Sequence, residues 1–195
     1  MVDSVLRSLG LEEGDEPLCV QFVNTVGSRN TESPNEYLAT PGDLKEWLLK
    51  RRIVPAGTAI DEPYRARTLQ LRDALYRIFS AVADGREPGD ADLEALNDEL
   101  CEALAKLELL PDLSWALHQN DPLERALILV SLSATDLLTG EFASRIRECA
   151  NEGCGWIFID HSKNRTRRWC SMSDCGNLAK ARRFQERKRA SRESP

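Results

Sequence analysis

The sequence offers little for membrane insertion or export. Its longest apolar run, residues 126–130, is interrupted by Ser131 and Ser133 and is far too short to cross a bilayer. Residues 1–17 include several acids and contain no apolar segment typical of a signal peptide. We therefore expect a cytoplasmic protein with no membrane partner, in which cysteine thiols stay reduced.

Signatures of catalysis are scarce as well. The chain contains no internal repeat, no glycine-rich phosphate loop and no nucleophile beside a plausible base. It has only two histidines, and we expect His118 in a loop or at the surface. Asn24, Thr25 and Arg29 form a candidate pocket for a small molecule, with or without enzymatic activity, although a hydrogen-bonded turn explains them equally well. We expect no enzyme and no catalytic residue.

Cysteine, by contrast, recurs in a regular pattern late in the chain. Cys149, Cys154, Cys170 and Cys175 form two pairs, with four residues inside each pair and fifteen between the pairs. Two short loops of this kind can each aim two thiolates at one Zn²⁺. Four sulfurs complete a tetrahedral shell and leave no position for a reacting water. We therefore predict one structural zinc ion and no catalytic metal.

Other interpretations of the cysteines are weaker. Two disulfides would need an oxidising compartment, which the first residues of the chain do not indicate. Cys19 and Cys101 lie inside apolar stretches and are expected to be ordinary core residues. His161 lies between the two pairs, but four better placed sulfurs already fill the zinc shell.

Charge is distributed unevenly along the chain. The formal net charge is −6, yet residues 145–195 contain thirteen Lys and Arg against six Asp and Glu, which leaves +7 there and −13 on residues 1–144. This asymmetry indicates a polyanionic partner for the C-terminal part. The same bases could instead balance a four-thiolate zinc centre or coat a solvated helix.

The N-terminal part has a clear helix start. Thr40, Pro41 and Asp43 are typical of an N-cap, a first helical residue and a third helical residue. Upstream, residues 18–26 are mostly apolar and rich in branched side chains, and their periodicity does not decide between strand and helix.

Long amphipathic stripes follow. Apolar residues recur with helical spacing over residues 63–84 and 93–107, and a capped helix that is apolar on most sides is predicted over residues 121–138. Residues 110–120 are expected to be irregular or a short strand. We therefore predict a mainly α protein, α+β overall, with a helical domain over residues 1–144.

A small zinc module is predicted over residues 145–195. Residues 156–160 suit a short strand, residues 161–166 a turn, and residues 167–169 the partner strand. Helix formers without a breaker extend over residues 178–189. The residues spaced for an inner face of that helix are Leu178, Ala181 and either Phe184 or Gln185. We call the two short cysteine loops the first knuckle (residues 149–154) and the second knuckle (residues 170–175). The order of first knuckle, hairpin, second knuckle and helix resembles a treble-clef module.

These residues also resemble a known family of bacterial proteins, which ends in a CGNR zinc finger and carries an N-terminal ABATE domain described as that of stress-induced transcription regulators. The segments that resemble the zinc finger are residues 149–158, 167–172 and 175–177. The segments that resemble the ABATE domain are residues 22–26, 43–48 and 71–75. The resemblance spans nearly the whole chain. One position departs from it, because Leu178 stands where the family name has Arg.

The resemblance implies a zinc-containing regulator that binds nucleic acid, most of all DNA. The acidic N-terminal domain would then serve ligand sensing, with an effector of unknown identity, or formation of a homodimer. If the family arginine contacts phosphate, Lys180, Arg182 or Arg183 must supply that contact here. Hairpin and helix side chains could both face one duplex. The candidate nucleic-acid-binding residues are Lys163, Arg165, Arg167, Arg168, Asn177, Lys180, Arg182, Arg183, Arg187, Lys188 and Arg189.

Two other functions stay open for the zinc module. RNA could bind instead, with Trp156, Trp169 and Phe184 stacking on bases if they are exposed, although packing around the zinc site is expected of them. Alternatively, the module could dock on a protein partner or on the protein's own acidic body. The basic residues would then be covered, and removal of residues 145–195 would destabilise the rest of the chain.

Overall fold

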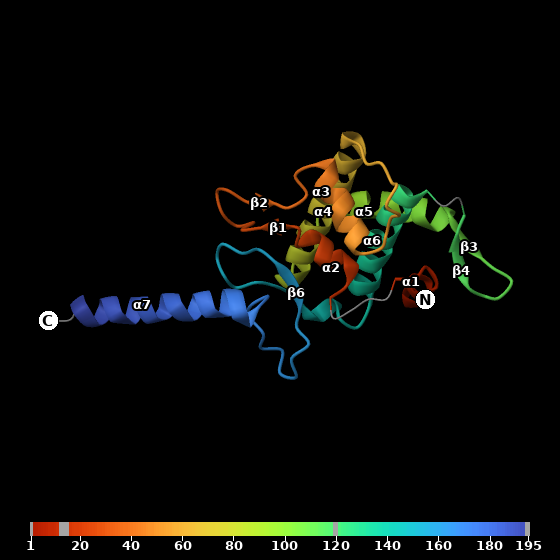
Figure 1. The fold of residues 1–195 in the computed structure, drawn as a ribbon. Coiled ribbons are helices and arrows are strands. Elements are labelled where there is room, and N and C mark those ends of the chain that lie inside the picture. Colours follow the sequence, from red (N-terminus) through yellow and green to blue (C-terminus); the bar gives the residue numbers. More distant parts are fainter. Residues whose placement is uncertain (1, 12–15, 119–120, 194–195) are drawn as a thin grey trace.

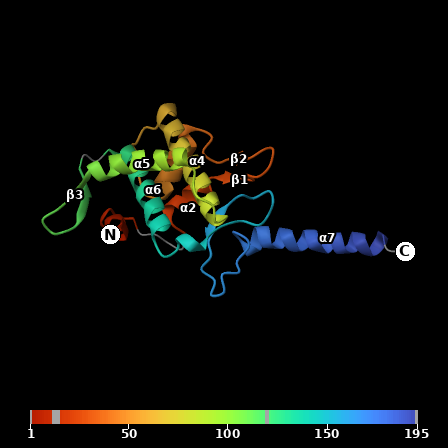
Figure 2. The ribbon, with the colours of Figure 1, turned by 180° about the vertical axis from the view of Figure 1, so that it is seen from behind.

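The computed structural model describes residues 2–11, 16–118 and 121–193, with the side chains of residues 5–11, 16–118, 121–185, 187 and 188. The protein is mainly helical, as predicted, and its body is built on three long helices (Figure 1). These are α4 (Glu62–Ala83), α5 (Asp90–Ala105) and α6 (Pro122–Thr139). The view from behind in Figure 2 shows α5 beside α4 and α6, and it packs against both.

Three shorter helices cover this body. α1 (Val2–Ser8) and α2 (Leu18–Val23) pack against α6, and α3 (Pro41–Lys50) packs against α4. The apolar segment whose structure periodicity left open is thus a short helix, and five of its six residues are buried. The backbone N–H of Cys19 donates to Ser133 Oγ at 3.1 Å, which joins α2 to α6.

The start of α3 has the capping geometry predicted from its sequence. Thr40 Oγ1 accepts a hydrogen bond from the Asp43 N–H at 3.2 Å, and Asp43 Oδ2 accepts one from the Thr40 N–H at 2.8 Å. Pro41 occupies the first turn, where its missing N–H has no helical partner to lose. α4 and α6 begin in the same way, with Asp61 and Asp121 as N-caps before a proline in the first turn.

The described part of the chain also contains three two-stranded antiparallel hairpins. β1 (Val26–Gly27) pairs with β2 (Asn35–Glu36), and β3 (Leu107–Leu109) pairs with β4 (Trp115–Leu117). The second hairpin occupies much of the segment expected to be irregular or a short strand. The third pairs β5 (Ile146–Glu148) with β6 (Ile157–Ile159), and Ile146 lies opposite Ile159.

This third hairpin corrects our prediction for the zinc module. β6 was expected, but its partner is β5, which precedes the first cysteine pair, and residues 167–169 form no strand. The reason is that the first knuckle itself closes the hairpin, since the Cys149 N–H donates to the Trp156 carbonyl at 2.8 Å. The segment after β6 is instead tied to the knuckle, where the Ala150 N–H donates to the Arg168 carbonyl at 2.8 Å.

The hairpin of the zinc module packs into the body of the protein. Ile146, Ile157 and Ile159 are buried in the same apolar core as α2, α4 and α6. A short 3₁₀ turn, η1 (Ala143–Arg145), links α6 to β5. The boundary at residues 144/145 therefore stays a prediction, and the residues on its two sides share one core.

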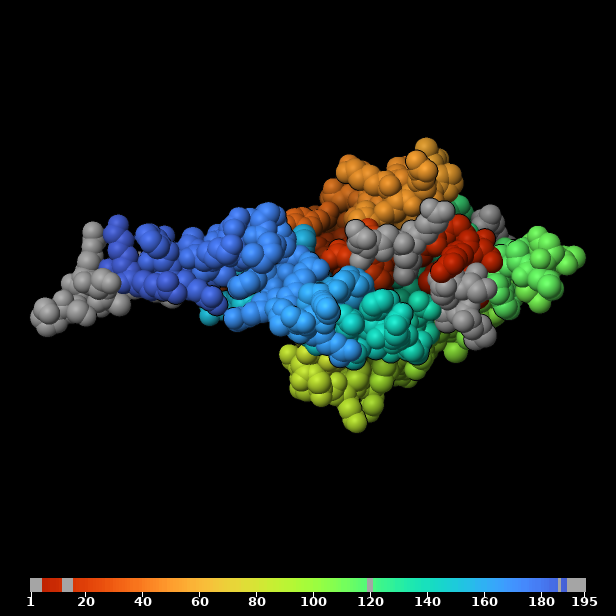
Figure 3. All heavy atoms as spheres, turned by 90° about the horizontal axis from the view of Figure 1, so that it is seen from below, coloured from red at the N-terminus to blue at the C-terminus, as the bar shows by residue number. Residues whose placement is uncertain are grey.

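The last helix leaves the body. α7 (Asn177–Glu193) follows a π-helical turn, η2 (Met172–Gly176), and extends away from the rest of the molecule in Figures 1, 2 and 3. The inner face predicted for this helix is wrong, because Leu178 is 52% exposed and Phe184 is 69% exposed. Ala181 is exposed as well. Helical spacing indicated a buried face, but too few apolar residues are present to hold the helix against the core.

The two remaining cysteines differ from each other. Cys19 is buried in α2, as predicted, whereas Cys101 is exposed on α5, so the prediction of a core role for it is wrong. Its apolar neighbours in sequence suggested burial, but Cys101 lies on the exposed face of the helix. None of the described helices is long and apolar enough to cross a membrane.

Candidate zinc centre and basic surface

The four paired cysteines converge on one point. Their sulfur atoms all lie within 4.8 Å of one another, and the sulfurs of Cys154 and Cys175 are each 3.7 Å from that of Cys170. Four thiolates bound tetrahedrally at ~2.3 Å from Zn²⁺ would be separated by roughly 3.8 Å. The sulfur spacing therefore fits one structural zinc ion with a complete shell of protein ligands.

The charges of these thiols support the same conclusion. A hydrogen bond with Cys170 lowers the pKa of Cys154 to about 5, and the same contact raises the pKa of Cys170. Burial, together with the thiols of Cys154 and Cys149, raises the pKa of Cys175 to about 11. Without a metal ion, ionisation of the Cys154 thiol thus disfavours ionisation of the Cys170 and Cys175 thiols. A divalent cation removes this conflict because it stabilises all four thiolates at once.

Asn151, inside the first knuckle, connects the sulfurs to α7. Its Nδ2 donates to Cys175 Sγ at 3.5 Å, and its backbone carbonyl accepts from the Cys154 N–H at 2.8 Å. Its Oδ1 in turn accepts from Arg182 Nη1 at 3.1 Å. Sequence reasoning missed this residue, and its place between two zinc ligands was the available signal. Asn151 orients α7 relative to the zinc site.

Asp160 organises the loop between the cysteine pairs. It is fully buried, and its carboxylate accepts from the backbone N–H groups of Ser162 at 2.9 Å and Arg167 at 3.1 Å. Burial acts in the opposite direction, but these hydrogen bonds dominate and lower the pKa of Asp160. The loop is therefore fixed by an ionised carboxylate.

Arg167 stabilises the same loop from its other side. Its guanidinium donates to the carbonyls of Trp169 at 3.0 Å, Ile159 at 3.3 Å and Cys170, and lies 4.5 Å from the centre of the Phe158 ring. All of these contacts are internal. We therefore leave Arg167 out of the surface that a nucleic acid could contact.

The first knuckle is bound directly to the N-terminal domain. Asn24 Nδ2 donates to the Ile157 carbonyl at 2.8 Å, and the Ile157 N–H donates back to Asn24 Oδ1 at 2.9 Å. Trp156 Nε1 donates to the Val26 carbonyl at 2.9 Å. The Arg29 N–H donates to the Cys154 carbonyl at 3.1 Å, so one bond reaches a zinc ligand itself.

Most polar groups of the candidate pocket are engaged within the protein, but Arg29 Nε is buried and has no hydrogen-bond partner among the described residues. The side-chain amide of Asn24 forms its two hydrogen bonds with the Ile157 backbone. Thr25 Oγ1 donates to the Phe22 carbonyl at 2.7 Å. Arg29 Nη2 donates to the Val23 carbonyl at 2.9 Å, and its guanidinium stacks 3.9 Å from the centre of the Tyr76 ring. These contacts are those of a hydrogen-bonded turn, and a ligand at these residues stays a prediction.

Most of the predicted nucleic-acid-binding residues lie at the surface. The exposed ones on the loop are Lys163, Arg165 and Arg168, and those on α7 are Asn177, Lys180, Arg182, Arg183, Arg187 and Lys188. The side chain of Arg189 lies outside the described residues. Figure 1 shows the loop of residues 161–166 and α7 leaving the zinc module in different directions. The structure therefore brings these residues to one module but not to one flat face.

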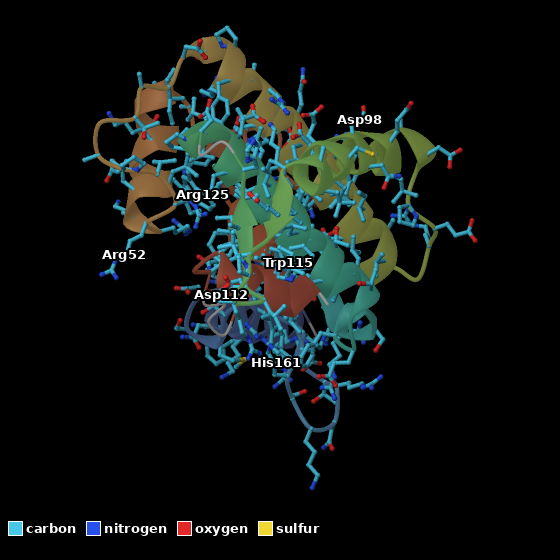
Figure 4. The ribbon with its side chains drawn as sticks, turned by 90° about the vertical axis from the view of Figure 1, so that its right-hand side faces the viewer. Arg52, Asp98, Asp112, Trp115, Arg125 and His161 are labelled. Carbon is cyan, nitrogen blue, oxygen red and sulfur yellow. The ribbon has the colours of Figure 1, made fainter. Side chains whose placement is uncertain are left out.

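The two histidines and two tryptophans discussed from the sequence are also described. His118 is exposed beside Glu108, and His161, at the base of the loop in Figure 4, is exposed with its ring 5.2 Å from that of Phe142. Neither histidine belongs to the sulfur cluster. Trp156 and Trp169 are half-buried near the zinc site.

A helical body joined to a treble-clef-like module with four converging thiols defines a zinc-finger protein. Comparison with family models agrees in both parts: residues 16–141 match ABATE, described as "Putative stress-induced transcription regulator", and residues 145–188 match the CGNR zinc finger. The chain therefore belongs to the ABATE family and carries a CGNR zinc finger after that domain, as its residues suggested. Among curated proteins, none matches the sequence.

Proposed function

We propose that this protein is a transcription regulator that binds double-stranded DNA through the surface of its zinc module and α7, without catalytic activity. The observation that carries the proposal is α7 itself, a basic helix that starts at the fourth zinc ligand and projects from an acidic body. In the body, basic residues lie among a twofold excess of acids, whereas α7 presents bases to solvent.

An isolated helix of this length gains little stability in water, because most helical stability in proteins comes from packing. α7 has almost no apolar face to pack, but it is rich in Lys and Arg. A polyanion would supply the missing partner by pairing with these side chains and releasing counterions. The exposure of the bases also argues against their docking on the protein's own acidic body.

The zinc site would give this helix a defined direction. Cys175 lies in η2, directly before α7, and Asn151 joins the opposite knuckle to Arg182. With Leu178 in place of the family arginine, Lys180 and Arg183 are the exposed bases of the first turns that make no such internal bond in the described structure. We assign the phosphate contacts next to the zinc site to these two residues.

The acidic N-terminal domain would serve ligand sensing or dimerisation. Its attachment to the zinc module supports a regulatory role, because residues 24–29 are hydrogen-bonded to Cys154 of the first knuckle and to Trp156 and Ile157, which follow it. Coupling of this kind needs two states of the connecting element, which an effector would bias.

Fluorescence anisotropy of the full chain with a random DNA duplex, at several salt concentrations, tests the proposal. We expect affinity to fall with salt by a log-log slope of about 0.9 for each phosphate neutralised. Reversal of charge at Lys180→Glu and Arg183→Glu should abolish most binding, whereas the matched pair Lys45→Glu and Arg86→Glu on the body should not. Binding that is absent, insensitive to salt or unchanged in the α7 variant contradicts the proposal.

RNA is the second candidate, favoured by one observation. Phe184 is 69% exposed in the middle of the basic helix, where its ring could stack on an unpaired base. Competition between single-stranded RNA and duplex DNA of equal length separates the two. A Phe184→Ala variant should weaken the binding of single strands and leave duplex binding nearly unchanged if both modes exist.

A further inference from the structure

An open pocket lies in the N-terminal domain, between the C-terminal end of α3 and the N-terminal end of α6. Its volume is about 570 Å³, which falls within the usual range for small-molecule sites. Its walls are mostly apolar and include Leu49, Val54 and Pro122. None of these residues belongs to the zinc module or to the pocket predicted from the sequence.

The ionisable residues that line this pocket, among those the structure describes, are two arginines. Arg52 lies just after α3 and Arg125 lies in the first turn of α6, and Figure 4 shows both on the same side of the molecule. The first turn of α6 borders the pocket at Pro122, but its Leu123 N–H is already bound by the Asp121 carboxylate, so the two arginines supply the positive charge. An acidic domain thus holds a pocket whose polar lining is cationic.

Arg125 lacks the carboxylate partner that several other arginines of this domain have. Arg67, Arg72 and Arg77 each bind a carboxylate at 2.7 to 2.9 Å. Arg125 is half-buried, but it donates only to the carbonyl of Leu9 and contacts no described carboxylate. Burial accordingly lowers the pKa of Arg125, and no acid among the described residues offsets this effect. A half-buried guanidinium that has no counterion among the described residues, and that lines an open pocket, suits an anionic ligand.

Arg52 occupies a backbone position that favours glycine. Its φ angle is +57°, in the left-handed region, because α3 ends in a turn in which the Ile53 N–H donates to the Leu48 carbonyl at 3.1 Å. Glycine adopts this conformation without a steric penalty, whereas arginine does not. The chain nonetheless places an exposed guanidinium here, at the rim of the pocket.

We propose that this pocket binds a small organic carboxylate with an apolar body. The carboxylate would lie against Arg125 and Arg52, and the apolar part would lie along Leu49, Val54 and Pro122. Planar carboxylates suit the forked donors of a guanidinium, and the apolar walls disfavour a small inorganic anion. Such a carboxylate would be the ligand that the N-terminal domain senses in the proposed function. Only this biological role, and not the binding itself, rests on the proposed function.

Isothermal titration calorimetry on the full chain tests the pocket without any nucleic acid. The probe is 2-naphthoate, its neutral analogue is 2-naphthamide, and inorganic phosphate supplies charge alone. We expect 2-naphthoate to bind with a dissociation constant of about 1 mM or below, given the binding energy typical of each ligand atom. The neutral analogue and inorganic phosphate should each bind at least tenfold more weakly.

Two variants assign this binding to the pocket. Arg125→Met should weaken 2-naphthoate roughly tenfold or more, because it removes a charge-assisted pair. Arg52→Gly should also weaken it, yet the protein should be at least as stable as wild type, because glycine suits φ +57°. Arg86→Met, which removes an exposed arginine outside the pocket, is the matched control and should bind normally.

The results separate this inference from the proposed function. Equal binding of the acid and the amide, or unchanged binding in a folded Arg52→Gly protein, overturns the carboxylate site whatever the DNA result. Loss of DNA binding in the α7 variant with intact naphthoate binding leaves the site standing. Absence of naphthoate binding in the zinc-loaded wild-type protein overturns it outright.

Discussion

Single side chains decide whether the zinc module forms, because each sulfur supplies one quarter of a closed shell. Two side chains that are not zinc ligands also support the module. The Asp160 carboxylate holds the loop between the cysteine pairs, and Asn151 links the two knuckles. The ligand identities followed from spacing alone. Asn151 and Asp160 did not, because the place of Asn151 between two ligands does not show that its amide meets a sulfur, and nothing in the sequence shows that Asp160 is buried.

Loss of one ligand should remove the metal. Cys170→Ser should weaken zinc binding by at least about a hundredfold, because a hydroxyl stays protonated at neutral pH and is a poor zinc ligand. Native mass spectrometry should show one zinc ion in the wild-type protein and none in this variant. Cys101→Ser removes an exposed thiol outside the cluster and should retain the ion. Retention of zinc by both variants would contradict the assignment.

Asp160 should make stability depend on pH in the acid range. Because the pKa of Asp160 is lowered in the folded state, its contribution is complete above its ordinary pKa of about 3.9 and is lost as the pH falls through the folded value. Asp160→Asn should cost about 1 to 3 kcal/mol near pH 7, since a single amide oxygen replaces two ionised acceptors. The difference between the two proteins should shrink below pH 4.

Denaturation followed at several pH values measures this effect. Asp98→Asn is a useful control, because Asp98 is exposed on α5, outside the zinc module. An Asp160→Asn cost that is the same at pH 7 and pH 3 would mean that the carboxylate charge plays no part.

At the scale of elements, helices with capped starts were predictable and short strands were not. Thr40-Pro41-Gly42-Asp43 specifies the start of α3 through local bonds, and the stripe predicted over residues 63–84 matches the buried face of α4. The stripe predicted over residues 93–107 matches less well, because Leu104 is 61% exposed. β5 was missed because three residues carry too little periodicity, and its pairing with β6 depends on the knuckle that closes them. The inner face assigned to α7 failed because periodicity reports a repeat and not whether a core lies opposite.

The capping box of α3 provides a test at this scale. Thr40→Ala should lower the free energy of unfolding by about 1 kcal/mol, because the Asp43 N–H loses its acceptor. Thr40→Ser keeps the hydroxyl and should cost a few tenths of this value at most. Chemical denaturation of the two variants side by side gives the comparison, and equal losses would show that the hydroxyl does not contribute.

The whole molecule is less divided than its sequence suggests. The change of charge near residue 145 coincides with the change between the two matched family segments, yet Ile146, Ile157 and Ile159 complete the core of the helical body. Such long-range packing leaves no trace in composition. The metal should therefore stabilise more than the residues that bind it.

Removal of zinc should consequently weaken the helical body. We expect chelation to reduce the hydrogen-exchange protection of α4 and α6 amides as well as those of β5 and β6. Asn24→Ala should cost about 1 to 3 kcal/mol even in the zinc-loaded protein, because two bonds to the Ile157 backbone are lost. Ser33→Ala, in the exposed loop between β1 and β2, is the control. Unchanged protection of α4 and α6 after chelation would show that the module folds independently.

The pairing of Asn24 with Ile157 also bears on how the chain matures during synthesis. The two residues are 133 positions apart, so the first part of the protein to leave the ribosome cannot complete its structure until the cysteine segment has emerged. Until then, α2 and α4 lack the isoleucines that cover them. A nascent chain starved of zinc would thus keep apolar surface uncovered at its N-terminal end, far along the chain from the missing ion.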